Sequence, residues 1–64
     1  MTLLEALTQT SGERFRPVGT KDWMYAAAVW TDDQYQSAPY WWNYAEPVIV
    51  TTNLLTADYE VEEL

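Results

Sequence analysis

The chain has 64 residues, with no cysteine, no histidine, and three cations against ten carboxylates, which give a net charge of −7. This composition excludes disulfides and thiolate metal sites, removes the commonest general base, and argues against direct binding to nucleic acid or anionic membranes. A domain of this size buries only about 60% of the surface that its unfolded chain exposes. We therefore expect residues 1–64 to form one small domain, stabilised as a homo-oligomer.

The first residues predict a short N-terminal helix. Thr2 and Glu5 have the spacing of a capping box, in which each side chain accepts a hydrogen bond from the other residue's backbone N–H. Leu3 and Leu7 belong to an apolar stripe at helical spacing, and Gly12 is suited to end the helix. Such a helix is expected to cover one side of a sheet.

Residues 13–18 alternate in polarity and predict a strand, with Phe15 and Pro17 on one side and Arg14 and Arg16 on the other. Proline lacks the N–H that a sheet ladder requires, so we expect an edge strand or a bulge here. A turn at residues 19–22 should follow, because glycine and aspartate favour turns.

The strongest strand prediction is for residues 23–30. Its apolar side chains would alternate between the two faces, with Trp23 and Tyr25 on one and Met24 and Trp30 on the other. Since both faces are apolar, we expect this strand to be covered on both sides.

The following segment is expected to be less regular. Residues 31–34 predict a turn or loop, from which a polar stretch leads to Pro39 and then to four rings within residues 40–44. Residues 48–51 are β-branched and predict a short strand.

The end of the chain predicts one helical turn, capped by Thr52 or Asn53, and a last strand at residues 58–62 with Tyr59 and Val61 facing inward. The order of these elements, with connections of hairpin length, indicates an α+β fold. We expect a small antiparallel β-sheet, a short N-terminal helix, and a helical turn before the last strand.

Catalysis has little support in the sequence. Hydrolases need nucleophile–base pairs that a chain without histidine and cysteine does not offer. The acidic pairs Asp32/Asp33 and Glu60/Glu62 are of the kind that usually lies in solvent. We therefore predict no catalytic residues, no metal site, no cofactor and no enzymatic activity.

Binding of a small anion has more support. All three cations, Arg14, Arg16 and Lys21, lie within eight residues and immediately precede Trp23. Arginine binds phosphate through two parallel hydrogen bonds, but salt bridges to the many carboxylates explain these cations equally well. Aromatic rings can stack on a nucleobase, although each single ring is more often part of a core or a subunit interface. The candidate rings are Trp23, Trp30, Trp41, Trp42, Tyr25, Tyr40 and Tyr44.

The two ends of the chain resemble a known family. Its members open with a helix of apolar-x-Glu-Ala-apolar pattern, a glycine, a basic strand and a tryptophan, and they close with a Leu-Leu-Ala-Asp-Asp-Trp-Glu-like signature. The opening is similar to residues 3–7, Gly12, residues 14–16 and Trp23, and the close is similar to residues 53–61. The chain thereby resembles the second type of Thoeris anti-defence protein, a group of small phage proteins that act as sponges for immune signalling nucleotides.

The resemblance implies an α+β fold, a homo-oligomer (a tetramer or dimer) with ligand sites between subunits, and sequestration of a cyclic ADP-ribose derivative or cyclic oligonucleotide without cleavage. It implies that Arg16, Trp23 and Asp58 lie near the pocket, as phosphate, base and ribose contacts in that order. With the candidate cations and rings, the predicted ligand-binding residues are Arg16, Trp23, Asp58, Arg14, Tyr25, Trp30, Trp41 and Trp42.

Two other functions remain open at this stage. The net charge of −7 also suits an acidic mimic of nucleic acid that inhibits a basic host protein, and the chain could be an assembly module without a ligand. No apolar run approaches the roughly 20 residues that span a bilayer, and the first residues lack the pattern of a secretory signal. We therefore expect the protein in the cytoplasm of the infected bacterial host.

Overall fold

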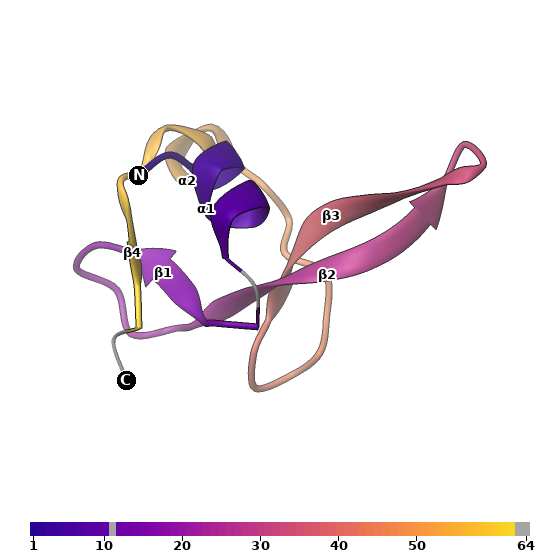
Figure 1. The fold of residues 1–64 in the computed structure, drawn as a ribbon. Helices are drawn as coiled ribbons and strands as arrows, with labels where there is room; N and C mark the ends of the chain where they lie inside the picture. The colour runs from indigo at the N-terminus through magenta and orange to yellow at the C-terminus, as the bar shows by residue number, and fades with distance from the viewer. Residues whose placement is uncertain (11, 63–64) are drawn as a thin grey trace.

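The computed structural model describes residues 1–10 and 12–62, and within them it confirms the α+β fold. Four described strands form one antiparallel sheet in the order β3-β2-β1-β4, and two helices lie on one side of it (Figure 1). The elements, in chain order, are α1 (Leu3–Gln9), β1 (Phe15–Pro17), β2 (Met24–Thr31), β3 (Gln34–Trp41), α2 (Thr52–Thr56) and β4 (Tyr59–Val61).

Helix α1 begins at the predicted capping box. The Glu5 backbone N–H donates to the Thr2 hydroxyl at 3.1 Å, and the Thr2 backbone N–H donates to the Glu5 carboxylate at 3.0 Å. The helix ends at Gln9 with Thr10 as its C-cap, so it stops before Gly12, the predicted end. Gly12 has φ +83°, a left-handed conformation that glycine adopts without strain and that redirects the chain toward β1.

Strand β1 lies inside the sheet, so the prediction of an edge strand is wrong. Val18 N–H donates to the Asp58 carbonyl at 2.8 Å and Glu62 N–H donates to the Arg14 carbonyl at 2.9 Å, which shows that even-numbered residues turn their backbone groups to β4. Pro17 therefore faces the β2 side, where the described pairing is confined to Phe15 and Met24. The missing N–H of the proline costs no ladder bond at this position.

Strands β2 and β3 form a long hairpin, and β3 is a strand that the sequence analysis missed. Thr31 pairs with Gln34, and the two residues between them, Asp32 and Asp33, have φ of 49° and 62°. Positive φ at both central positions is the conformation of a type I′ turn, whose twist matches that of a hairpin. Once this turn forms, β2 pairs with the polar stretch along eight residues in register.

The expected strand at residues 48–51 does not form. Within the described structure, β3 is joined to residues 46–48 by the Tyr40–Pro47 bridge and by two hydrogen bonds, from Val48 N–H to the Pro39 carbonyl and from Trp41 N–H to the Glu46 carbonyl. Val48 is buried, but Ile49 is 84% exposed, because the chain leaves the sheet edge at once to reach α2. Thr51 caps α2 through a 3.3 Å bond from the Leu54 N–H, one residue before the predicted cap.

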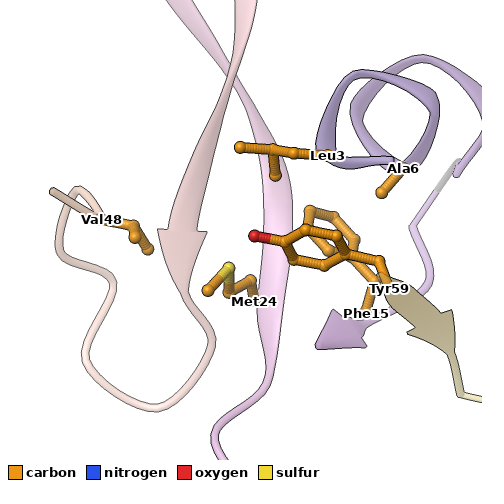
Figure 2. Packing of buried hydrophobic residues seen from close by; sticks show 6 residues of the cluster. All are labelled: Leu3, Ala6, Phe15, Met24, Val48 and Tyr59. Atoms are coloured by element: carbon orange, nitrogen blue, oxygen red, sulfur yellow. The ribbon is translucent and has the colours of Figure 1, made fainter. Parts of the chain in front are cut away.

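The core lies between the helices and the sheet, and it is small. Figure 2 shows Leu3 and Ala6 of α1 above the rings of Phe15 and Tyr59, whose centroids are 6.0 Å apart in an edge-to-face arrangement. The buried members among the described residues are Leu3, Ala6, Phe15, Met24, Val48 and Tyr59. The prediction that β2 is covered on both faces is wrong, because Met24 is its one buried residue and Ala28 and Trp30 are exposed.

Candidate ligand-binding face of the sheet

The face of the sheet opposite the helices carries cations, rings and carboxylates in place of a second apolar layer. Side chains alternate along each strand, so residues between the core positions point to this side. Strand pairing places such residues from β1, β2, β3 and β4 next to one another on one surface. We call this surface the open face, and it consists of Arg14, Arg16, Trp23, Tyr25, Tyr40, Trp42, Glu60 and Glu62.

The two arginines of the open face lie over its tryptophan rings. The Arg16 Cζ atom is 4.2 Å from the centroid of the Trp23 ring, and Arg14 Cζ is 5.0 Å from the same centroid. Arg14 is also 5.2 Å from the centroid of Trp42. Cation–π contacts at such distances contribute about 0.5–1 kcal/mol each when exposed. They fix the guanidinium planes beside the rings, so that cation and aromatic surface form one patch.

The aromatic part of this patch continues toward β3. The Tyr25 ring lies 5.7 Å from the Trp42 ring in an edge-to-face arrangement and 5.9 Å from the Tyr40 ring. Tyr25 and Tyr40 are directly paired residues of β2 and β3, and both are half-buried. The open face therefore runs from charged residues at β4 to rings at β3.

Each arginine is also paired with a carboxylate of β4. Arg14 binds Glu62 through both Nε and Nη2, and this ion pair lowers the pKa of Glu62 and raises that of Arg14. Arg16 donates from Nε to Glu60 Oε1 at 2.7 Å. The register that places Arg16 opposite Glu60 accounts for both pairs. Salt bridges, the alternative explanation of the cations in the sequence, are therefore present.

The two arginines differ in what they can still bind. Arg14 has a two-point bond to Glu62, whereas Arg16 uses only Nε within the described chain and keeps both Nη groups free as donors. Arg16 also lines an open depression of about 740 Å³, the size of a small-molecule site. The other described residues that line it are Met1, Trp23, Glu60, Val61 and Glu62.

The structure brings together five of the eight residues predicted to bind a ligand, namely Arg14, Arg16, Trp23, Tyr25 and Trp42. The other three lie elsewhere. Trp41 points to the opposite side of the sheet and packs against the core, next to its strand partner Met24. Trp30 lies near the end of the hairpin with its ring 4.9 Å from that of Tyr35.

Asp58 is not among the described residues that line the depression, although its carboxylate is bound to Met1, which does line it. It accepts a 2.7 Å hydrogen bond from the Met1 ammonium group, and that bond lowers the pKa of Asp58. The sequence analysis expected Asp58 to contact a ribose and left Glu60 and Glu62 in solvent, so it named no particular carboxylate as the partner of either arginine. The signal that could have found them is their alternation on the last strand, which matches that of the arginines on β1.

Within the described residues no group of three or more acidic side chains could hold a metal ion, and no helix is long and apolar enough to cross a membrane. Comparisons with protein-family models, with curated proteins and with solved structures found no match for this chain.

Proposed function

We propose that the protein binds a nucleotide second messenger on the open face and sequesters it without cleavage. The observation that supports this most is the joint position of Arg16 and Trp23. The Arg16 guanidinium, whose two Nη groups have no partner among the described residues, lies 4.2 Å from a half-buried indole, and both line the same depression. The guanidinium can donate hydrogen bonds to a phosphate, and the indole offers a flat surface on which a nucleobase can stack.

The ligand class comes from the resemblance of the chain ends to the phage sponges. In this proposal the ligand is a cyclic ADP-ribose derivative or a cyclic oligonucleotide, and the protein acts against host defence in the host cytoplasm. Arg16 binds a phosphate through its Nη groups, Trp23 and Trp42 provide stacking surface, and Arg14 holds Trp23 and Trp42 in place. The net charge of −7 opposes an anionic ligand only weakly, because charges farther from the site than the Debye length of about 8 Å at physiological salt are largely screened.

The arrangement of the carboxylates gives little support to the alternative function, an acidic mimic of nucleic acid. Glu60 and Glu62 are neutralised by the two arginines. Glu5 caps α1, and Asp32 and Asp33 lie at the far end of the hairpin. A mimic of a phosphate backbone needs an ordered row of unpaired carboxylates on one face, and these residues are on separate elements.

A thermal-shift screen with cyclic ADP-ribose isomers and cyclic dinucleotides tests the proposal. We expect at least one of these nucleotides to raise the melting temperature, and chromatography of the ligand released by heat should recover it intact. Trp23→Ala should weaken binding about 5- to 150-fold, which corresponds to the ~1–3 kcal/mol of one stacked base.

Arg16→Gln and Lys21→Gln form a matched pair for the same screen. Both remove one positive charge, but Lys21 is exposed in the turn before β2 and has no ion pair in the described structure. Arg16→Gln should abolish the shift and Lys21→Gln should retain it. A wild-type protein that responds to none of the nucleotides would refute the proposed function.

A further inference from the structure

The depression beside Arg16 is lined by carboxylates as well as by a cation. Glu60 and Glu62 both line it, and each is bound to one of the two arginines. The ammonium group of Met1, a further lining residue, is bound to Asp58 at 2.7 Å. The described residues around the depression therefore form three ion pairs, each of one cation and one carboxylate.

These ion pairs leave the site with no surplus positive charge. Lys21, the remaining cationic side chain, is exposed in the turn before β2 and is not among the described residues that line the depression. A phosphate that binds to the Nη groups of Arg16 therefore shares this guanidinium with the Glu60 carboxylate. Each negative charge that a ligand carries beyond the first lies near Glu60 and Glu62 without a cation to offset it.

The second oxygen of the Glu60 carboxylate adds a requirement for hydrogen-bond donors. Glu60 accepts the bond from Arg16 at Oε1, and its Oε2 atom has no partner among the described residues. The Glu60 side chain is 41% exposed, so a ligand in the depression can reach it. An ionised carboxylate only accepts hydrogen bonds. A hydroxyl or amino group of the ligand is therefore favoured beside Glu60, and a phosphate oxygen is repelled.

The two kinds of phosphate ester differ in both respects. A phosphodiester of a nucleotide carries one negative charge and is flanked by sugars whose hydroxyl groups are donors. A terminal phosphomonoester carries about −1.5 to −2 at pH 7 and adds further acceptor oxygens. The additional charge is repelled more strongly beside a protein surface than in bulk water, because the effective dielectric constant is lower there.

We propose that the site selects phosphodiesters over phosphomonoesters, and that Glu60 is the residue that determines this selectivity. The selectivity rests on the proposed function, since it concerns the same site. It adds that charge and hydrogen-bond donors, and not closure of the ring, decide which nucleotides bind. Hydrolysis of one diester bond by one water molecule opens a cyclic dinucleotide and leaves a terminal phosphomonoester. The protein therefore retains the intact messenger and releases the opened one.

Two pairs of linear nucleotides test this selectivity on the wild-type protein by isothermal titration calorimetry. The dinucleotide ApA and its 5′-phosphorylated form pApA differ only in a terminal monoester, and ADP-ribose and ADP differ in whether a ribose esterifies the second phosphate. The buffer contains no divalent cation, because a metal ion would neutralise the monoester. The diester of at least one pair should bind, and its monoester partner should bind at least about tenfold more weakly.

Glu60→Gln and Asp32→Asn form a matched pair of variants for the same titrations. Each removes one negative charge, and glutamine keeps an oxygen that can accept the bond from Arg16. Asp32 lies in the turn of the β2–β3 hairpin, where its φ of 49° is one that asparagine also adopts. Glu60→Gln should lower the preference for the diester over the monoester at least about threefold, and Asp32→Asn should keep the wild-type preference.

The outcomes separate this selectivity from the proposed function. No binding of cyclic ADP-ribose, cyclic di-AMP or any of the linear nucleotides at millimolar concentrations would refute the proposed function and the selectivity with it. Binding of a cyclic nucleotide without binding of either linear diester would mean that ring closure is required, and would overturn the selectivity alone. A monoester that binds the wild-type protein as tightly as its diester, or an unchanged preference in Glu60→Gln, would overturn it as well.

Discussion

The hydroxyl of Tyr59 provides a quantitative test of how the small core is held together. Tyr59 is 3% exposed, packs edge-to-face on Phe15, and donates a 2.6 Å hydrogen bond to the Leu54 carbonyl. Leu54 belongs to α2, a helix of five residues whose last carbonyls have no intrahelical donor. The bond therefore joins β4 to the end of α2.

The substitution Tyr59→Phe removes this bond and leaves the ring in place. A hydrogen bond contributes about 0.5–1.5 kcal/mol net to the free energy of unfolding. The Leu54 carbonyl that loses its donor adds a desolvation cost, but this cost is small because Leu54 is only half-buried and water can reach it. We expect a loss of about 1.5 kcal/mol in the free energy of unfolding. A 64-residue domain has about 3–10 kcal/mol in total, and the melting temperature should fall by about 6–12 °C.

Thermal and urea unfolding followed by circular dichroism measures this loss, with Tyr44→Phe as the matched control. Tyr44 is 67% exposed, and its hydroxyl has no hydrogen-bond partner among the described residues. The control should be within about 0.5 kcal/mol of the wild type, as for other exposed positions. Equal effects of the two substitutions, or none from Tyr59→Phe, would refute the role assigned to the Tyr59 hydroxyl.

Three further predictions concern stability. Hydrogen bonds from the Met1 ammonium and from Arg14 lower the pKa values of Asp58 and Glu62, respectively. These ion pairs therefore stabilise the folded state above the ordinary pKa values of 3.8 and 4.5, and the stabilisation is lost as the pH falls below them. Melting temperatures measured from pH 7 to pH 2 should fall in that acid range. Gly19 has φ +88° and open space where a Cβ would lie, so Gly19→Ala should cost about 1–2 kcal/mol in urea unfolding from the backbone alone. Asp33→Gly should raise the melting temperature by a few degrees, because a type I′ turn favours glycine at this position, and an unchanged or lower value would contradict the turn assignment.

Local patterns in the sequence predicted the elements that depend on local interactions. The Thr2–Glu5 capping box needs only residues three apart, and the alternation around Phe15 survives because one face is buried. Strand β3 was missed because Gln, Ser, Ala and Pro have low strand propensity, and it forms because the turn at Asp32 and Asp33 aligns it with β2. The β-branched residues 48–50 have the propensity but no strand to pair with along their length.

In the candidate site too, the features set by local patterns were predictable, and those set by strand pairing were not. Alternation predicted that Arg14 and Arg16 share one side of their strand, and the structure confirms this; Trp23 joins them because Phe15 pairs with Met24. Alternation on the last strand pointed to Glu60 and Glu62 as well as Asp58, but the sequence does not specify which of these residues lie opposite the arginines. The register that aligns Arg16 with Glu60 excludes Asp58 from the depression and brings in Glu60 and Glu62.

The claim that a nucleotide binds on the open face is tested most directly by the indole N–H signals of the four tryptophans in a nuclear magnetic resonance titration. The four rings report on three places: Trp23 and Trp42 on the open face, Trp41 against the core, and Trp30 near the turn of the β2–β3 hairpin. With cyclic ADP-ribose isomers or cyclic dinucleotides, we expect saturable shifts of the Trp23 and Trp42 signals and unchanged Trp30 and Trp41 signals. Shifts confined to Trp30 or Trp41, or no shifts at millimolar nucleotide, would contradict the account.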